Sequence, residues 1–173
     1  SLREPEAVAL EPRQTGGPKK VTLSLGSSAV WSERMLATLE RGITGGKWYS
    51  LIDKVWEKNN LRLAAWSVVR KDGSPGVDGE SCEALEAHLE ERIDGLSRQL
   101  REDRYQPKPV KRVWIDKPGS KEKRPLGVPV VRDRVVETSL LYVLEPIFER
   151  DFAEHSYGFR PGRSPHAALD ALC

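Results

Sequence analysis

Basic side chains gathered in one segment are the residues with the clearest chemical potential in this sequence. Between Arg101 and Arg124, nine basic residues stand against four acidic ones, which leaves five net positive charges. The segment from Glu80 to Asp94 has the opposite balance, with six acidic residues against one arginine. The two segments can pair with each other in the fold, or the basic one can face an external ligand that carries phosphates.

The motifs do not indicate a self-contained catalytic or metal site. A Walker phosphate loop is excluded, because Lys47 of a Gly-Gly-Lys run precedes Trp48 where Ser or Thr is needed. The glycines of residues 73–79 follow the spacing GxxGxxG, which is not the dinucleotide-binding fingerprint. The histidines are isolated from one another, and the two cysteines have no CxxC or His partner, so we expect free thiols. These residues are His88, His155, His166, Cys82 and Cys173.

The length and composition suit one globular domain with some unstructured length attached. The chain has 173 residues, of which 38% are hydrophobic and 31% charged, with 12 prolines and 14 glycines. Its longest uncharged apolar stretch, residues 138–144, is far shorter than the ~20 residues of a membrane span. No signal sequence opens the chain at Ser1, so we expect a cytoplasmic protein without membrane contact.

The sequence up to residue 104 predicts a tail followed by helices. Residues 1–29 are rich in Pro and Gly and are expected to be a flexible tail or linker. Residues 30–46 are expected to hold a short helix, capped by Ser28 and ended by Gly42, and then a Gly-rich connection. A helical region follows over residues 47–104. Its first helix covers residues 48–56, and Asn60 is expected to cap the second. The tryptophans of this part are expected to lie in the core.

The remaining elements surround the basic segment. Residues 72–79, with three glycines and a proline, predict a tight loop, and a long helix over residues 80–104 follows it. Residues 110–116 and 123–130 predict a β-hairpin whose tip is the Lys117-Pro-Gly-Ser run. A helix over residues 133–152 is expected to be kinked at Pro146. Ser164 and Pro165 should open a last helix that runs to the end of the chain.

Six motifs in a fixed order resemble one protein family. They are Ser74-Pro-Gly-Val-Asp-Gly79, Tyr105-x-Pro-x-Pro-Val-Lys-Arg112, Lys117-Pro-Gly-Ser, Lys123-Arg-Pro-Leu-Gly-Val-Pro129, Leu144-Glu-Pro-Ile-Phe148 and Tyr157-Gly-Phe-Arg-Pro-Gly-Arg163. Each motif alone is weak, but together they closely resemble the amino-terminal part of group II intron-encoded reverse transcriptases, also called maturases. The resemblance covers residues 48–173, which is more than two-thirds of the chain.

The resemblance implies an α+β fold, namely the helix-rich fingers subdomain of a right-hand polymerase with a basic β-hairpin. Residues 47–104 would then be the amino-terminal extension, and residues 105–173 the hairpin and the helices that lead into the palm. In the family the hairpin folds over the incoming nucleotide, and Lys117, Arg124 and Lys111 match its nucleotide-binding positions. The alternative is a solvated hairpin whose lysines only protect its edges.

The same resemblance implies a surface for RNA template and primer. The loop formed by Ser74, Pro75, Gly76, Val77, Asp78 and Gly79 resembles the lid that lies over the template strand. Arg112, Arg160 and Arg163 are expected to contact template or primer phosphates. Structural roles stay open at this point: Asp78 could cap the helix expected at Glu80, and Arg160 could pair with Glu149 or Glu154.

The carboxylates that bind metal in this family come later than the motifs present here. We therefore expect a fragment, truncated before the palm active site, that binds no cofactor itself and is inactive alone, although its parent family is an RNA-directed DNA polymerase. The full-length parent is expected to use Mg²⁺, a dNTP, a DNA primer, a template strand and intron RNA.

Two other classes of function compete with this interpretation. A GxxG loop between helices, followed by a hairpin, superficially suggests a stand-alone KH-type module that binds single-stranded RNA without catalysis. Such loops usually carry basic residues, whereas this one carries Asp78 and Pro75. A pure protein-interaction scaffold would leave the basic cluster of residues 111–124 without a ligand.

Overall fold

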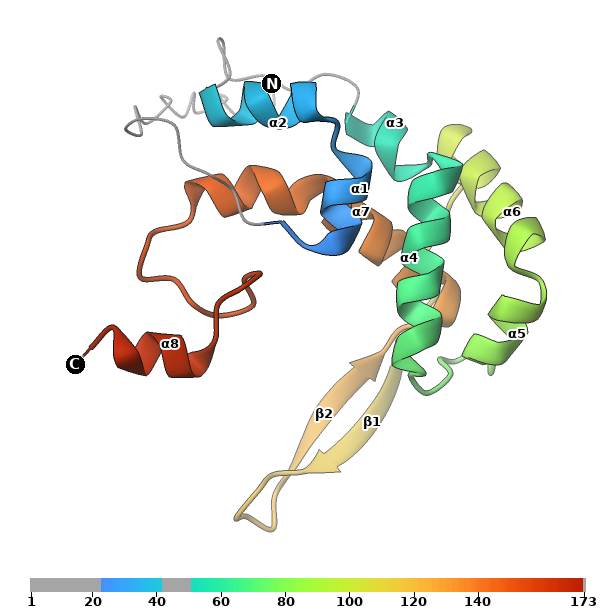
Figure 1. Cartoon of the computed structure of the whole chain (residues 1–173). Helices are drawn as coiled ribbons and strands as arrows, with labels where there is room; N and C mark the ends of the chain where they lie inside the picture. The colour runs from blue at the N-terminus through green and yellow to red at the C-terminus, as the bar shows by residue number, and fades with distance from the viewer. Residues whose placement is uncertain (1–22, 42–50, 173) are drawn as a thin grey trace, which may run out of the picture.

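The computed structural model describes residues 23–41 and 51–172 and shows a helical body from which one β-hairpin projects (Figure 1). The expected α+β class is confirmed at this level. Within the described residues, no helix is both long and apolar enough to cross a membrane. The elements are α1 (Leu25–Val30), α2 (Glu33–Arg41), α3 (Leu51–Val55), α4 (Lys58–Lys71), α5 (Cys82–Ala87), α6 (Leu89–Arg101), β1 (Lys111–Asp116), β2 (Lys123–Val128), α7 (Val131–Asp151) and α8 (Pro165–Asp170).

Helix α4 forms the centre of the core, where it packs against α5, α6 and α7. Small residues let the helices approach closely, since Ala64 and Ala65 are completely buried on α4. Larger side chains from all four helices fill the space around them. The buried cluster contains Leu61, Ala64, Ala65, Val68, Cys82, Leu85, Ile93, Leu96, Val131, Val135 and Tyr142.

Asn60 lies inside α4, so its expected role as a helix cap is wrong. The cap is Glu57, whose carboxylate accepts the Asn60 N–H at 3.2 Å. The buried Asn60 amide instead donates to the carbonyls of Lys54 and Ser139, at 2.8 and 3.1 Å. The Ser139 hydroxyl in turn donates to the Val55 carbonyl at 2.7 Å. These bonds satisfy the carbonyls of Lys54 and Val55 at the end of α3, which have no partner within that helix, and they hold α3 against α4 and α7.

The expected helix capped by Ser28 is two helices. Ser24 caps α1, while Trp31 adopts an extended backbone and ends it. A residue that is distant in the sequence fixes this start of α1. The Glu145 carboxylate on α7 accepts a hydrogen bond from the Ser24 hydroxyl at 2.6 Å and another from the Ser27 hydroxyl. The expected cap at Gly42 lies outside the described residues, as do Trp48 and most of the expected tail.

The expected helix over residues 80–104 is also divided. Ser81 caps α5, which ends at Ala87, and α6 begins at Leu89 after the cap residue His88. No Gly or Pro marks this break, so tertiary packing must impose it. The short α5 packs against both α4 and α7, whereas α6 packs mainly along α4. Asp78 consequently does not cap a helix at Glu80.

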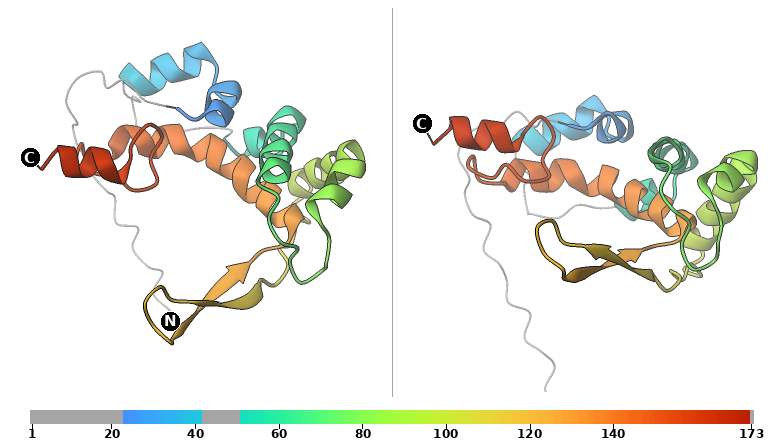
Figure 2. Two further views of the ribbon diagram at one scale, coloured as in Figure 1. Left: turned by 60° about the horizontal axis from the view of Figure 1, so that its bottom comes forward. Right: turned by 90° about the horizontal axis from the view of Figure 1, so that it is seen from below.

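Helix α7 is the longest of the described elements, and the helices from α1 to α5 pack against it (Figure 2). It contains Pro146, as the sequence indicated, and a kink at that residue stays a prediction. The loop after α7 leads to α8, where Ser164 accepts the Ala167 N–H at 3.1 Å and Pro165 is the first helical residue. That start was expected, but α8 ends at Asp170.

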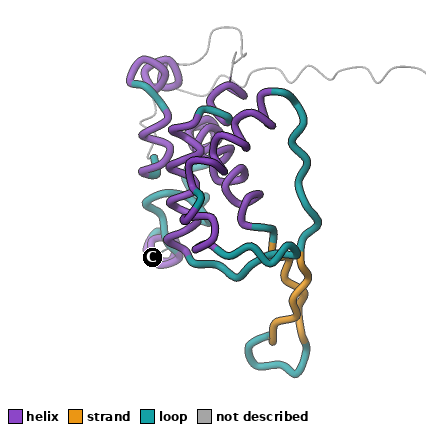
Figure 3. The backbone as a smooth tube through the Cα atoms, turned by 90° about the vertical axis from the view of Figure 1, so that its right-hand side faces the viewer, coloured by secondary structure: helices purple, strands orange, loops and turns teal. Residues whose placement is uncertain are grey.

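The hairpin strands pair antiparallel, from Lys111 opposite Val128 to Asp116 opposite Lys123. Figure 3 shows them leaving the helical part, with the turn at their far end. At the turn, Gly119 has a φ of 75°, and the Lys117 N–H donates to the Glu122 carbonyl at 3.0 Å. The expected hairpin and its Pro-Gly tip are confirmed.

The loop between α4 and α5 approaches the start of α7 very closely at Gly76. A Cβ atom on Gly76 would lie 2.6 Å from the Val130 Cα and 2.7 Å from its nitrogen. Because these are backbone atoms, they cannot rotate away. The glycine therefore allows the loop to lie against the root of the hairpin.

We expect Gly76→Ala to lower the free energy of unfolding by about 1 to 3 kcal/mol, because the added methyl group overpacks a backbone contact. Gly95→Ala is the matched control: its Cβ would meet no atom within 4 Å, and it lies within α6. Replacing a helical glycine there should stabilise the protein by roughly 0.5 to 1 kcal/mol. Urea unfolding of both variants measures the difference, and equal effects would contradict the close contact.

Candidate nucleic-acid interface

The pairing register divides the hairpin into two chemically different faces. Residues directly opposite each other share a face, and side chains alternate along each strand. Lys111 and Arg124 therefore lie on one face, separated by Val113 and Ile115. Arg112 lies on the other face. The three cations that the sequence grouped in one hairpin thus belong to two surfaces.

Three of these cations have no partner in the part of the chain that the structure describes. Lys111, Arg112 and Arg124 are exposed and form neither an ion pair nor a side-chain hydrogen bond there. Lys117 differs, since its ammonium group lies 2.7 Å from the Glu122 carboxylate across the turn. That pair is exposed, so water and an incoming anion compete with it easily.

The acidic segment does not neutralise the basic one within the described ion pairs. Glu80 pairs with Arg92, Glu90 with Arg62, and Asp94 with Lys58. All three pairs lie within the helical body. The interpretation in which the two segments pair with each other is therefore wrong for these residues, and the hairpin cations stay available for an external ligand.

Trp114 is a candidate contact residue that the sequence analysis missed. It shares the Arg112 face, lies opposite Pro125, and is 56% exposed. An exposed indole beside a free guanidinium offers a stacking surface next to a phosphate contact. Its position in the strand, two residues after Arg112, could have predicted that it shares the Arg112 face. The tryptophans of the helical region were instead all expected to lie in the core. Among these, Trp31 is buried but Trp66 is 40% exposed.

The buried carboxylate of Asp133 fixes the root of the hairpin. It accepts the Tyr105 hydroxyl at 2.6 Å and the Lys108 N–H at 2.7 Å. Arg132 approaches it at 3.5 Å and also lies over the Tyr105 ring, 5.3 Å from its centre. Burial, helped by the hydrogen bond and the charge of Asp133, raises the pKa of the Tyr105 hydroxyl well above its ordinary value.

The loop of residues 72–79 is held against this root rather than left open. The Lys108 ammonium group lies 3.0 Å from Asp78, and Arg134 donates to the Ser74 carbonyl. Burial alone would raise the pKa of Asp78, but the Lys108 hydrogen bond and the Glu80 N–H outweigh it and lower that pKa. Asp78 thus ties the loop to the hairpin segment.

Only part of the predicted template loop is accessible. Val77 is 49% exposed and Ser74, Asp78 and Gly79 are exposed, whereas Gly76 is buried against Val130. A GxxG loop of the KH type must present its glycine backbone to a nucleic-acid strand. The burial of Gly76 argues against that alternative.

Arg160 has a structural environment. Its guanidinium binds the Glu149 carboxylate, with both side chains buried, and also donates to the carbonyls of Ala153 and Ser156. This arrangement favours the pairing with Glu149 that the sequence left open. Arg163 donates to the Glu154 carbonyl and lies over the Tyr157 ring. The contact of either arginine with template or primer is untested.

Within residues 23–41 and 51–172, no three side chains of His, Cys, Asp or Glu come together as a possible metal site. The Cys82 thiol is free and buried, and it lies 3.6 Å from the Gly73 carbonyl. Cys173 lies outside the described residues.

The chain is similar in sequence to proteins that include intron-encoded proteins and intron maturases. It is 47% identical over 96 residues, 56% of the chain, to Protein YkfC of Escherichia coli, and 41% identical over 83 residues, 48% of the chain, to Group II intron-encoded protein LtrA of Lactococcus lactis. Nuclear intron maturase 1, mitochondrial, of Arabidopsis thaliana is 54% identical over 44 residues, 25% of the chain. The chain spans 25%, 14% and 6% of these relatives, respectively. No protein-family model matches it.

The Tyr105–Asp133 contact predicts a specific loss of stability in alkali. Because the folded state raises the pKa of Tyr105, the phenol keeps its proton in the folded protein after the unfolded chain has lost it. The resulting stability is fully present below the ordinary tyrosine pKa of about 10 and decreases as pH rises above it.

We expect the free energy of unfolding to decrease more steeply from about pH 9 to about pH 11 in the original protein than in Tyr105→Phe. Urea unfolding across this range measures both slopes. Tyr157→Phe removes a phenol outside the Asp133 contact and should keep the original slope. A Tyr105→Phe slope equal to the original would exclude the proposed coupling.

Proposed function

We propose, from the kinship of this chain with group II intron-encoded proteins and intron maturases, that it forms the RNA-binding amino-terminal and fingers region of a protein of that kind. The observation that carries the proposal is the projecting hairpin, which has free cations on both of its faces. The names of the relatives point to intron RNA as the partner. The right-hand polymerase architecture and the division into extension and fingers are part of this proposal.

We assign the two hairpin faces to different ligands. The face with Arg112 and Trp114 combines charge with an aromatic surface, as single-stranded RNA requires. Ser74, Val77 and Gly79 are exposed on the loop that is held against the hairpin root, and we assign them to the template strand as well. Cations and a stacking ring together bind RNA with little dependence on base sequence, because phosphates and ring faces are common to all nucleotides.

The opposite face suits a nucleotide triphosphate. Arg124 and Lys111 share it, and Lys117 lies at the turn that follows β1. A guanidinium group can bind two phosphate oxygens at once, whereas a lysine supplies a single point charge. In a longer protein that also contains a palm with its Mg²⁺ ligands, these cations would stabilise the charge on the phosphates of a dNTP while a DNA primer is extended.

RNA affinity should depend steeply on salt. With about five phosphates neutralised, the slope of log K against log salt should be roughly −3 to −4 for single-stranded RNA. Arg112→Gln combined with Lys123→Gln should flatten this slope by about 1.4, because two cations of the RNA face are removed. Fluorescence anisotropy with a labelled RNA at several salt concentrations measures both slopes.

The matched control for that experiment removes two cations from α2, at the opposite end of the molecule from the hairpin (Figure 1). Arg34→Gln with Arg41→Gln changes the net charge equally and should leave the slope unchanged. Equal flattening in both double variants would mean that overall charge, and not the hairpin, binds RNA. A salt-independent affinity of the original protein would refute RNA binding through phosphates.

The nucleotide assignment requires a longer protein that contains this chain and extends primers. There, Arg124→Ala should lower kcat/KM for the dNTP about 10- to 150-fold, which corresponds to one charge-assisted contact of about 1.5 to 3 kcal/mol. Affinity for the template and primer should change little. Equal losses in both measurements would assign Arg124 to RNA instead, and Arg150→Ala on α7 serves as a control for charge.

A further inference from the structure

The end of α6 turns back on itself and creates a polar pocket beside the hairpin root. The Arg104 N–H donates to the Gln99 carbonyl at 2.9 Å, and the Asp103 N–H donates to Leu100 at 3.3 Å. Asp103 has a φ of 53°, the left-handed conformation that completes a Schellman motif. This turn brings Arg104 next to the last turn of α6, where Arg98 and Gln99 lie.

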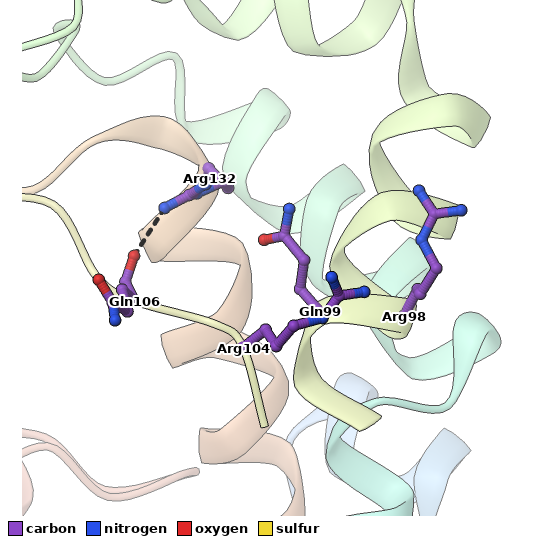
Figure 4. Close-up of a pocket in the computed structure, with 5 residues that line it drawn as sticks. All are labelled: Arg98, Gln99, Arg104, Gln106 and Arg132. Carbon is purple, nitrogen blue, oxygen red and sulfur yellow. Dashed lines mark hydrogen bonds between the residues drawn. The ribbon is translucent and has the colours of Figure 1, made fainter. Parts of the chain in front are cut away.

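The pocket has a volume of about 390 Å³, and guanidinium and amide groups line it. Figure 4 shows Arg98 and Gln99 on α6, Arg104 and Gln106 on the chain after it, and Arg132 on α7. None of these lining residues carries a carboxylate. Three positive side chains thus line one pocket, two from α6 and the segment directly after it and one from α7, about 30 positions further along the chain.

One of the three guanidinium groups is held in place before any ligand binds. Arg132 donates to the Gln106 carbonyl at 2.8 Å and stacks on Tyr105. Its side chain is 27% exposed, so part of it faces solvent. A fixed donor loses little conformational freedom when it binds an anion, which favours affinity.

The other two arginines are accessible. Arg98 is exposed and forms no ion pair or side-chain hydrogen bond in the part of the chain described. Arg104 pairs with Glu102, but both side chains are largely exposed, so an anion can replace that carboxylate. The pocket therefore combines one fixed cation with two adaptable ones.

We propose that this pocket binds a phosphate group, supplied by a nucleic-acid backbone. Arginines bind phosphate oxygens through paired N–H groups, and the Gln99 and Gln106 amides can donate further hydrogen bonds. The site goes beyond the proposed function, because it lies on the helical body and not on the hairpin. Residues 105–110 connect the pocket with β1, where Arg112 lies on the face that we assign to RNA, so one strand can follow the segment.

Another explanation is that the arginines only offset the negative end of the α6 dipole. Arg98 and Arg101 lie in its last turn, where cations stabilise a helix. That role requires no ligand and affects stability alone. The two explanations therefore differ in whether removing the arginines changes the binding of phosphate.

The test uses the whole chain with Arg98→Gln and Arg104→Gln combined, while Arg132 is kept because it supports the hairpin root. We expect affinity for a labelled single-stranded RNA to fall at least about tenfold, and the salt slope to flatten by about 1.4. The α2 double variant described above should change neither quantity. Urea unfolding of the pocket variant shows whether stability is retained.

Inorganic phosphate distinguishes the source of the group. NMR of the arginine side-chain N–H signals should show Arg98 and Arg132 shifting in the original protein when phosphate is added. Shifts together with the loss of RNA affinity support the proposal. Shifts with unchanged RNA affinity restrict the site to free phosphate and overturn the nucleic-acid source.

Lower stability with no phosphate shift and unchanged RNA affinity overturns the site entirely and supports the dipole role. If the original protein binds no RNA but phosphate shifts the pocket arginines, the proposed function fails while the phosphate site stands. The two failures are therefore distinguishable.

Discussion

The buried carboxylate of Asp133 holds together the features on which any binding role depends. A buried charge is costly unless hydrogen bonds replace its water, and Tyr105 and the Lys108 N–H do so here. Both donors come from the extended segment between α6 and β1. These bonds attach the segment to the start of α7 and so set the direction in which the hairpin leaves the helices. They also hold Gln106 beside Arg132, on one side of the arginine pocket.

Acidic and basic side chains are separated between the helical body and the hairpin. Glu80, Glu90 and Asp94 have partners in the helical body and do not neutralise the cations of the hairpin and the pocket. Pairs on the helical body are exposed and contribute little to stability individually. Their consequence for binding is that these three carboxylates do not compete with phosphates for the hairpin cations.

The sequence was a good guide where the cause of the structure is local. The hairpin follows from alternating strand residues around Pro118 and Gly119, and the start of α8 follows from Ser164 and Pro165. It was a poor guide where distant residues decide. Ser24, and not Ser28, is the helix cap, and its hydroxyl binds Glu145 on the distant helix α7. No local residue pattern marks the break between α5 and α6 at His88.

The candidate site shows the same limit. The motifs identified the hairpin cations, but only the register assigned Arg112 to a different face from Arg124. Arg160 was singled out by its motif, and its buried pairing with Glu149 became visible only in the fold. The arginine pocket could not be predicted, because a turn at Asp103, a conformation that ordinarily favours glycine, brings Arg104 back to Arg98, and Arg132 is added from α7.

The packing of α4 against α7 determines the order in which the chain can fold during translation. Asn60 and Ser139 are 79 positions apart, so the core cannot close until the ribosome has released most of α7. The hairpin pairs residues that are near in sequence and can form earlier. Until α7 has been synthesised, Leu61, Ala64 and Val68 cannot pack against that helix, and the nascent chain leaves this apolar stripe exposed.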